Sequence, residues 1–365
     1  MEEEFIDISA LAPYIQISKI GLNSVRGSIL PPVEANIEKL KIYFTNLGYT
    51  PYFDKIKESE SPHVIYLARI DTIKAENQIL TKQNLSIRLN RSVVLATVLF
   101  VATIFTTLLV GSLNRGGNPF INFKDIILGA PFSFSLLLIL TGHELGHYLT
   151  ARKYGVSVTL PYFLPIPHPL IGTMGAFIRI KSVLPNKQAL VRIGLAGPLT
   201  GFILAVPITI IGLVLSKAVN VTDVSNSFGL GSSLLFHFIY NILHPNLPKG
   251  YDIVLHPMAF AGWLGFFVTA MNLLPVGQLD GGHIAYAVFG KRRKYLMIAV
   301  IASMTALGLL WPGWFFWVLL IIVFGLRHPK AQDEITQLKK SDKILAGLAF
   351  LILILAFIPN PFPIK

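Results

Sequence analysis

Residues 126–149 read IILGAPFSFSLLLILTGHELGHYL, and this stretch decides the fold. The run is apolar and long enough for a helix to cross the ~30 Å hydrocarbon layer of a membrane, which takes about 20 residues. Its second half nevertheless holds His143, Glu144 and His147. Because ionisable side chains inside a bilayer are costly, each of the three is a candidate functional residue. The stretch therefore predicts a membrane-spanning helix that carries a polar site.

The composition of the whole chain is that of a membrane protein. Of its 365 residues, 53% are hydrophobic and only 14% are charged, and the mean hydropathy is +0.61. These values lie outside the range of soluble domains. We predict a polytopic α-helical membrane protein with about seven (roughly six to eight) transmembrane helices. The apolar segments are 93–113, 126–149, 193–215, 258–274, 295–310, 313–326 and 344–358.

The same pattern divides the chain into three regions. Residues 1–90 read as a small soluble α+β domain and linker, with a helix at 35–47, strands at 52–56 and 63–70, and a polar, helical stretch at 71–91. Residues 91–330 form a transmembrane core, with one motif on a helix at 126–150 and a second on a helix at 256–282. Residues 331–365 supply a linker and the last transmembrane helix. The acidic start MEEEFIDIS lacks the features of a signal peptide, so we expect none.

The net charge of +12 indicates orientation in the membrane and not nucleic-acid binding. Lys and Arg stand at the ends of the apolar segments and form no single basic stripe, so we expect no nucleic-acid partner. Alternate loops, at 152–192, 291–294 and 327–343, are rich in these residues, whereas the loops between them carry few. By the positive-inside rule, the rich loops and the N-terminal domain are cytosolic. The charges also favour a hairpin of two short spans across Pro312 and Gly313.

The spacing of His143, Glu144 and His147 is typical of a zinc site. The chain has no cysteine, so a bound metal must use His and carboxylate ligands. Two histidines four residues apart lie on one face of a helix, where both imidazoles can reach one Zn²⁺, and Glu144 can act as general base toward a water molecule. A catalytic zinc takes three protein ligands and keeps one open position, so one ligand must come from elsewhere.

The third ligand is predicted to be Asp280, in the sequence NLLPVGQLDGGH at 272–283. Asp280 and Glu144 are the acids closest to the apolar segments, and the loop charges place both motifs near the cytosolic face. Other interpretations stay open. Asp280 followed by Gly281 is also an ordinary turn or cap signal, and His283 could be the ligand instead. Asn272 could make only a helix-to-helix hydrogen bond, or it could hold a substrate carbonyl or stabilise an oxyanion.

At these two motifs the chain resembles the site-2 protease family of intramembrane zinc metalloproteases, peptidase family M50. The family patterns H-E-x-x-H and N-x-x-P-x-x-x-L-D-G are both met, and the resemblance covers roughly residues 125–290. It implies one Zn²⁺ per chain, held by His143, His147 and Asp280. It also implies that Glu144 is the general base and that Asn272 orients the substrate.

The resemblance extends to the connector between the second and third spans. Residues 161–180 look like the family's membrane-associated β-hairpin, whose edge can hold an extended substrate by strand addition; a plain proline-rich connector is the alternative. We expect Gly172, Gly175 and Pro275 to contact the substrate. The sequence AGPLTG at 196–201 also looks like a family signature, which we interpret mainly as helix packing. Without a recognisable PDZ or CBS module, the chain looks closer to the plastid, cyanobacterial and archaeal branch.

The resemblance implies zinc-dependent hydrolysis of a peptide bond in or next to a transmembrane segment of another protein. The expected partners are transmembrane protein substrates and the lipid bilayer. We expect a multi-pass integral membrane protein with a cytosolic N-terminus and an active site near the cytosolic face. A membrane metal transporter and a catalytically inactive relative that only binds membrane proteins are the alternatives.

Overall fold

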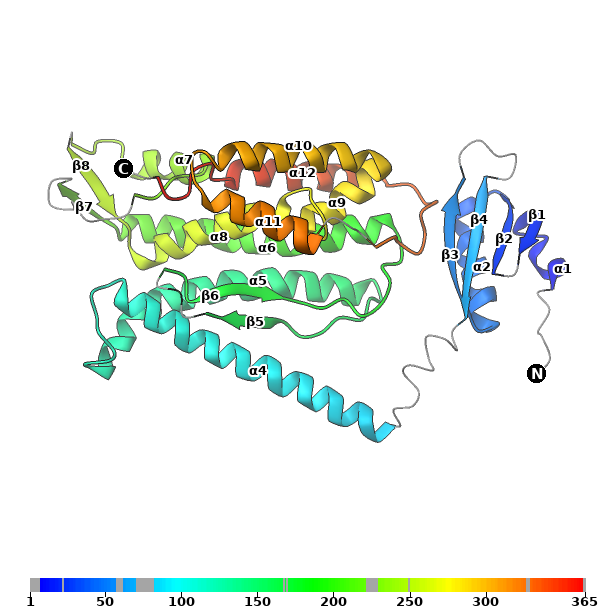
Figure 1. Ribbon diagram of the computed structural model, residues 1–365, viewed down its shortest axis with the longest axis horizontal. Coiled ribbons are helices and arrows are strands. Elements are labelled where there is room, and N and C mark those ends of the chain that lie inside the picture. The colour runs from blue at the N-terminus through cyan, green and yellow to red at the C-terminus, as the bar shows by residue number, and fades with distance from the viewer. Residues whose placement is uncertain are drawn as a thin grey trace. The chain divides into compact units, whose positions relative to one another are not determined.

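The computed structural model describes residues 7–21, 23–56, 62–69, 82–166, 168, 170–220, 229–248, 250–325 and 329–363. The chain forms two compact units, each described by itself below (Figure 1). The N-terminal unit comprises Met1–Arg91, Val183–Ala189 and Pro329–Lys339, and the helical unit comprises Ser92–Ser182, Leu190–His328 and Lys340–Lys365. Two short segments from the later part of the chain thus belong to the N-terminal unit.

The N-terminal unit is built on a four-stranded antiparallel sheet in the order β1-β2-β4-β3. Helix α2 presents Ile37, Leu40 and Phe44 at helical spacing, and they are buried in one core with Phe53 and Ile65 of the sheet. The predicted helix and both predicted strands are present, and β1 and β2 complete the sheet. Its elements are α1 (Ile8–Leu11), β1 (Ile15–Gly21), β2 (Ser24–Ile29), α2 (Val33–Asn46), β3 (Tyr49–Lys55) and β4 (His63–Arg69).

Residues 332–334 extend this sheet along the outer edge of β3. The Phe53 N–H donates to the Gln332 carbonyl at 2.8 Å, and the Glu334 N–H donates to the Phe53 carbonyl at 3.0 Å. On their other side the Gln332 N–H donates to the Leu184 carbonyl at 2.9 Å. We call 183–189 and 329–339 the edge segments. The predicted boundary at residue 330 is wrong for the linker at 331–339, because this linker is hydrogen-bonded into the N-terminal unit. Composition alone does not indicate a pairing between residues so far apart in the chain.

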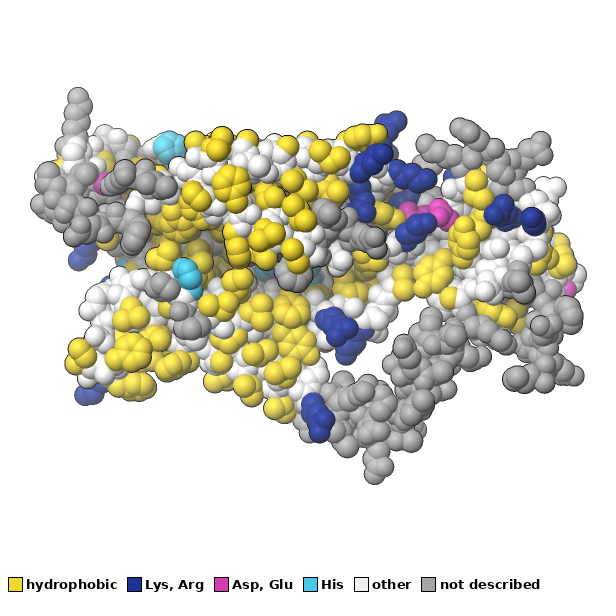
Figure 2. Space-filling model, in the orientation of Figure 1, with side chains coloured by type: hydrophobic (Ala, Val, Ile, Leu, Met, Phe, Trp, Pro, Cys, Tyr) yellow, Lys and Arg dark blue, Asp and Glu magenta, His cyan; other side chains and the backbone are white. Residues whose placement is uncertain are grey.

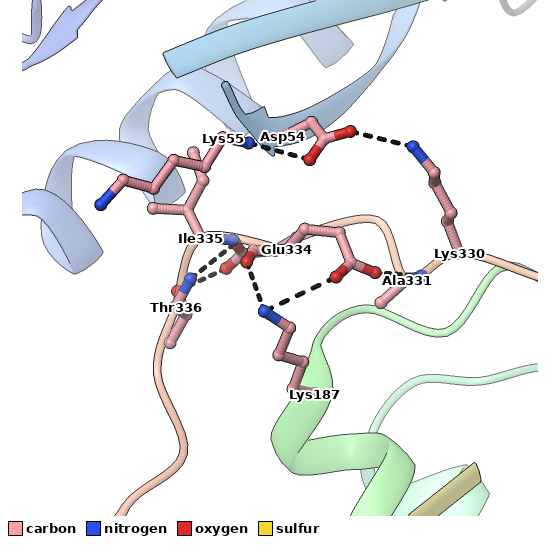
Figure 3. Close-up of polar contacts among 9 residues, drawn as sticks. Asp54, Lys55, Lys187, Lys330, Ala331, Glu334, Ile335 and Thr336 are labelled. Atoms are coloured by element: carbon pink, nitrogen blue, oxygen red, sulfur yellow. Dashed lines mark hydrogen bonds and ion pairs between the residues drawn. The ribbon is translucent and has the colours of Figure 1, made fainter. Parts of the chain in front are cut away.

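Charged side chains support the edge segments (Figure 3). Lys187 Nζ lies 3.5 Å from Glu334 Oε2, in a pair that is mostly buried. Lys330 Nζ lies 2.9 Å from Asp54 Oδ2, but this pair is more exposed and contributes little to stability, about 0–1 kcal/mol. Backbone hydrogen bonds therefore attach residues 332–334 to β3, and residues 183–189 are held through their bonds to 332–334.

The helical unit contains helices in all seven predicted apolar segments. Among the described residues, three helices are long and apolar enough to cross a membrane: Arg91–Leu113, Phe123–Lys153 and Lys187–Val214. The others are shorter, so the total of seven spans stays a prediction. Of the predicted polar stretch, 71–81 lies outside the described residues. The helices are α4 (Lys82–Leu113), η1 (Phe123–Gly129), α5 (Ala130–Lys153), α6 (Lys187–Val214), α7 (Leu234–Leu243), α8 (Pro257–Leu273), α9 (Asp280–Phe289), η3 (Gly290–Arg292), α10 (Arg293–Leu307), α11 (Gly313–Gly325) and α12 (Lys340–Ala356).

The helical unit is apolar outside and holds polar groups inside. Val98, Val101 and Phe105 of α4 are more than half exposed, and Figure 2 shows apolar side chains over much of the outer face of this unit. In contrast, Thr107 of α4 and Ser133 of α5 are buried and hydrogen-bonded to each other at 2.7 Å. An apolar exterior is what lipid requires of a protein surface, because charged and polar side chains are costly there.

The predicted single helix at 256–282 is wrong, because the structure has two helices there. Helix α8 ends at Leu273, a connector follows at 274–279, and α9 begins at Asp280. Pro275 cannot donate a backbone hydrogen bond, and Gly277 has φ of +57°, so neither continues a helix. The break places Asp280 at the start of a separate helix.

A short β-hairpin lies between α5 and α6. Strand β5 (Tyr162–Pro165) pairs with β6 (Thr173–Phe177) in antiparallel fashion. Gly172, with φ of +74°, directly precedes β6. The second small sheet is formed by β7 (Lys217–Asn220) and β8 (Tyr251–Val254). The predicted hairpin at 161–180 is therefore present.

Candidate metal centre

Helix α5 carries the first part of the site on its inner face. His143 and His147 are one turn apart and only 3% and 6% exposed, and Glu144 is 5% exposed. Pro131 lies in the first turn of the helix, where proline is well tolerated, and Gly155, with φ of +69°, follows its C-terminal end. The long apolar run between these signals keeps the two histidines well inside one continuous helix.

Asp280 of α9 completes a compact group with the two histidines. Nε2 of His147 lies 3.2 Å from Nε2 of His143 and 3.2 Å from Oδ2 of Asp280, and Nε2 of His143 lies 3.5 Å from the same oxygen. Tetrahedral ligands at about 2.0–2.1 Å from a Zn²⁺ are roughly 3.3–3.4 Å apart. Three ligand atoms at this spacing suit a tetrahedral ion with its fourth position open. Among the described residues, His143, His147 and Asp280 are the His and acidic side chains whose ligand atoms lie close enough together to hold one metal ion.

A backbone carbonyl of α6 sets the orientation of His147. Nδ1 of His147 lies 2.8 Å from the carbonyl oxygen of Ile193. A carbonyl can only accept, so Nδ1 carries the proton and Nε2 is left with its lone pair facing His143 and Asp280. Metal-binding histidines usually have such a partner on the second ring nitrogen. Asn272 of α8 lies on the other side, with its Nδ2 at 3.1 Å from Nε2 of His143.

Two glycines of α6 let that helix approach the imidazoles. A Cβ built on Gly197 would lie 2.0 Å from Nε2 of His147, and one on Gly201 would lie 3.2 Å from Nδ1 of His143. Likewise, a Cβ on Gly146 of α5 would lie 2.4 Å from the Ala196 carbonyl oxygen. The small residues at 196–201 therefore do more than pack helices, since Gly197 adjoins a predicted ligand directly. Sequence analysis missed this role, although the repeated glycines were its signal.

The candidate metal centre opens into a cavity of about 210 Å³. A larger cavity of about 500 Å³ lies beside it, with mostly apolar walls from α5, α8, α11 and β6. Asn272, Gln278 and Leu279 line both cavities. The predicted alternative ligand His283 also lines the smaller cavity but does not belong to the three-ligand group.

The predicted substrate-binding residues differ in their positions. Gly175 lines the larger cavity. Gly172 faces α4, where an added Cβ would lie 2.8 Å from the Thr106 carbonyl oxygen, and Pro275 is buried in the connector. Among the described residues that line the two cavities, neither Gly172 nor Pro275 is found. Their predicted contact with substrate has no support from this arrangement.

An H-E-x-x-H helix that faces a carboxylate from another helix, inside an apolar helical unit, defines a membrane-embedded metallopeptidase-like protein. Residues 131–311 match peptidase family M50, so the chain carries a domain of this family. This confirms the resemblance seen in the two sequence motifs.

Curated relatives agree with this family. The chain is 34% identical over 245 residues to "Probable zinc metalloprotease EGY1, chloroplastic" of Arabidopsis thaliana, covering 63% of this chain and 42% of the relative. It is 30% identical over 248 residues to EGY2 of the same plant, covering 67% and 44%. It is 31% identical over 291 residues to EGY3 of Oryza sativa subsp. indica, covering 73% and 48%. The chain thus spans less than half the length of these relatives, and no solved structure matches it.

Proposed function

We propose that this chain is a zinc-dependent endopeptidase that hydrolyses a peptide bond in or next to a transmembrane segment of another membrane protein. The observation that carries the proposal is the spacing of 3.2–3.5 Å among the ligand atoms of His143, His147 and Asp280, with Glu144 beside them in an apolar helical unit. The names of the relatives, zinc metalloproteases, support zinc as the ion.

Each polar residue has a role in this proposal. His143, His147 and Asp280 would hold the ion. Bound zinc would supply Lewis-acid activation of water and of the scissile carbonyl. Glu144 takes a proton from the attacking water and passes it to the leaving amine, so that the hydroxyl ends on the carbonyl carbon and the proton on the nitrogen. Asn272, in the same cavity, contacts the substrate carbonyl.

Orientation in the membrane is part of the proposal. The basic loops, placed by the positive-inside rule, support a cytosolic N-terminus and an active site near the cytosolic face, so one product is released to the cytosol. The substrates are transmembrane proteins, and the bilayer is the second partner.

The experiment is cleavage of a transmembrane test substrate by purified protein in detergent, with Glu144→Gln as the variant. We expect the variant to lose about 10²–10⁴-fold in rate, as for loss of a general base, while still binding one Zn²⁺ per chain. A chelator should stop the wild-type enzyme, and added zinc should restore it.

Two outcomes would contradict the proposal. No chelator-sensitive product from wild type would favour the inactive, binding-only relative. Zinc uptake into proteoliposomes that survives Glu144→Gln, together with no cleavage, would favour the metal transporter. Cleavage in detergent thus separates the protease from the inactive relative, and zinc uptake into proteoliposomes separates it from the transporter.

A further inference from the structure

The connector between α8 and α9 has one exposed side chain, that of Gln278. Leu274, Pro275, Val276 and Gly277 are buried, and Leu279 is half-buried. Gln278 is also one of the residues that line both cavities. The exposed side chain of Gln278 is therefore part of the wall that the larger, apolar cavity shares with the cavity of the metal centre.

The connector backbone is held tightly in place. A Cβ added to Gly281 would lie 1.9 Å from the Leu273 carbonyl oxygen, and one added to Gly282 would lie 2.5 Å from the Gly277 carbonyl oxygen. The connector thus lies directly against the first turn of α9. Because Gln278 extends from this fixed backbone, it lies at a defined place beside Asp280.

The side-chain amide of Gln278 makes no hydrogen bond with any other residue that the structure describes. Asn272, the other amide that lines both cavities, differs because its Nδ2 lies 3.1 Å from His143 Nε2. An amide has donors and acceptors that match those of a peptide group. Gln278 therefore offers an uncommitted hydrogen-bonding group at a point where the surrounding walls are largely apolar.

Strand β6 also borders both cavities. Gly175 lines the larger cavity, and the next residue, Ala176, lines the cavity of the metal centre. An extended peptide that passes from the first cavity to the second therefore has β6 on one side and Gln278 near its path. Peptide groups freed from a helix must find new hydrogen bonds in an apolar environment.

We propose that Gln278 binds a backbone peptide group of the substrate where the substrate is unwound beside the cleaved bond. This inference rests on the proposed endopeptidase function and adds a substrate-binding residue to it. The side chain recognises the backbone and not a particular side chain, so the contact suits many transmembrane sequences.

The test uses full-length protein and Gln278→Met, which keeps a side chain of similar length but removes the amide. Gln16→Met, at an exposed glutamine of β1, is the matched control. The substrate is a synthetic transmembrane peptide that wild type cleaves, together with analogues in which one peptide bond near the cut is replaced by an ester. An ester lacks the N–H and is a weaker acceptor.

We expect Gln278→Met to reduce kcat/KM about tenfold, the loss that follows when a buried polar group is left unpaired. Zinc content should stay at that of wild type. At one ester position the wild-type rate should fall, whereas the Gln278→Met rate should not fall further, because the contact is already absent. A purely structural role for Gln278 would not create such a position-specific coupling.

Two results would overturn the inference, provided that wild type shows chelator-sensitive cleavage. Either Gln278→Met has the same kcat/KM as wild type, or every ester slows wild type and Gln278→Met equally. A wild-type enzyme without chelator-sensitive cleavage would instead overturn the proposed function, and the inference would fall with it. The two failures are told apart by the wild-type reaction alone.

Discussion

Gly197 lies against the ring of His147, where there is no room for a larger residue. In Gly197→Ala the new Cβ would be 2.0 Å from Nε2 of His147, far below a real contact distance. The imidazole must leave its present position beside His143 and Asp280 unless helix α6 shifts, so we expect zinc affinity to fall about 10–100-fold, as when the support of a metal ligand is lost. Metal analysis after dialysis against graded zinc concentrations measures this.

Gly347 of α12 is the matched control for this substitution. A Cβ there meets no atom within 4 Å, so Gly347→Ala should bind zinc as wild type does. If Gly197→Ala retained wild-type zinc affinity, α6 would have to be able to move away from α5. The close contact between Gly197 and His147 would then not be needed for zinc binding.

Single residues of the site differed in how well the sequence could predict them. His143, Glu144 and His147 are marked by a rare spacing on an apolar helix, and Asp280 by being one of very few acids near such segments. The structure brings His143, His147 and Asp280 together, while their binding of zinc stays a prediction. Gly197 could not be assigned, because its role depends on the distance between two helices and spacing along one chain does not contain that distance.

At the scale of elements, the long apolar helices were predictable and the break between α8 and α9 was missed. Hydrophobicity continues from 258 to 274, so a helix was correctly placed there, but hydrophobicity does not report where the helix ends. The signals for the end, Pro275 and Gly277, are present in the sequence. Strand β1 was not predicted, and it contributes little to the core because five of its seven residues are exposed.

The attachment of residues 332–334 to β3 depends on backbone hydrogen bonds, which proline can remove. Gln332→Pro deletes the N–H that donates to the Leu184 carbonyl at 2.9 Å. A net loss of about 1 kcal/mol for one hydrogen bond predicts roughly fivefold faster opening. Hydrogen exchange at the amides of Phe53 and Glu334, which pair across this edge, should accelerate by that factor.

Gln332→Ala is the control for this prediction. It keeps the backbone N–H and removes only the side-chain hydrogen bond from Nε2 to the Pro51 carbonyl at 3.0 Å. Its exchange rates should lie closer to wild type than to Gln332→Pro. Identical exchange in all three proteins would mean that the edge segments are held by side chains and not by the backbone.

At the scale of the whole molecule, the proposed orientation can be tested because the chain has no cysteine. Lys291→Cys lies in a basic loop and Lys124→Cys in a loop with few basic residues, and both side chains are exposed. By the positive-inside rule, Lys124→Cys should react with a membrane-impermeant thiol reagent in intact expressing cells. Lys291→Cys should react only after the membrane is opened.

Wild type, without a thiol, gives the background of this labelling. Labelling of Lys291→Cys in intact cells, with Lys124→Cys protected, would reverse the orientation and place the candidate metal centre near the opposite face. Labelling of both Lys124→Cys and Lys291→Cys in intact cells would mean that their two loops lie on the same side of the membrane, contrary to the charge pattern.

The pairing of β3 with residues 332–334 also fixes an order of assembly. The Gln332 side chain and the Pro51 carbonyl it binds are 281 residues apart in the chain. While α4 to α11 are being synthesised, the outer edge of β3 has no partner from this segment, and an unpaired edge strand is a template for wrong pairing. The N-terminal sheet can thus form early, but residues 332–334 can cover the edge of β3 only after they are synthesised. A chain that stops before residue 332 therefore exposes a β3 edge that can pair with other chains.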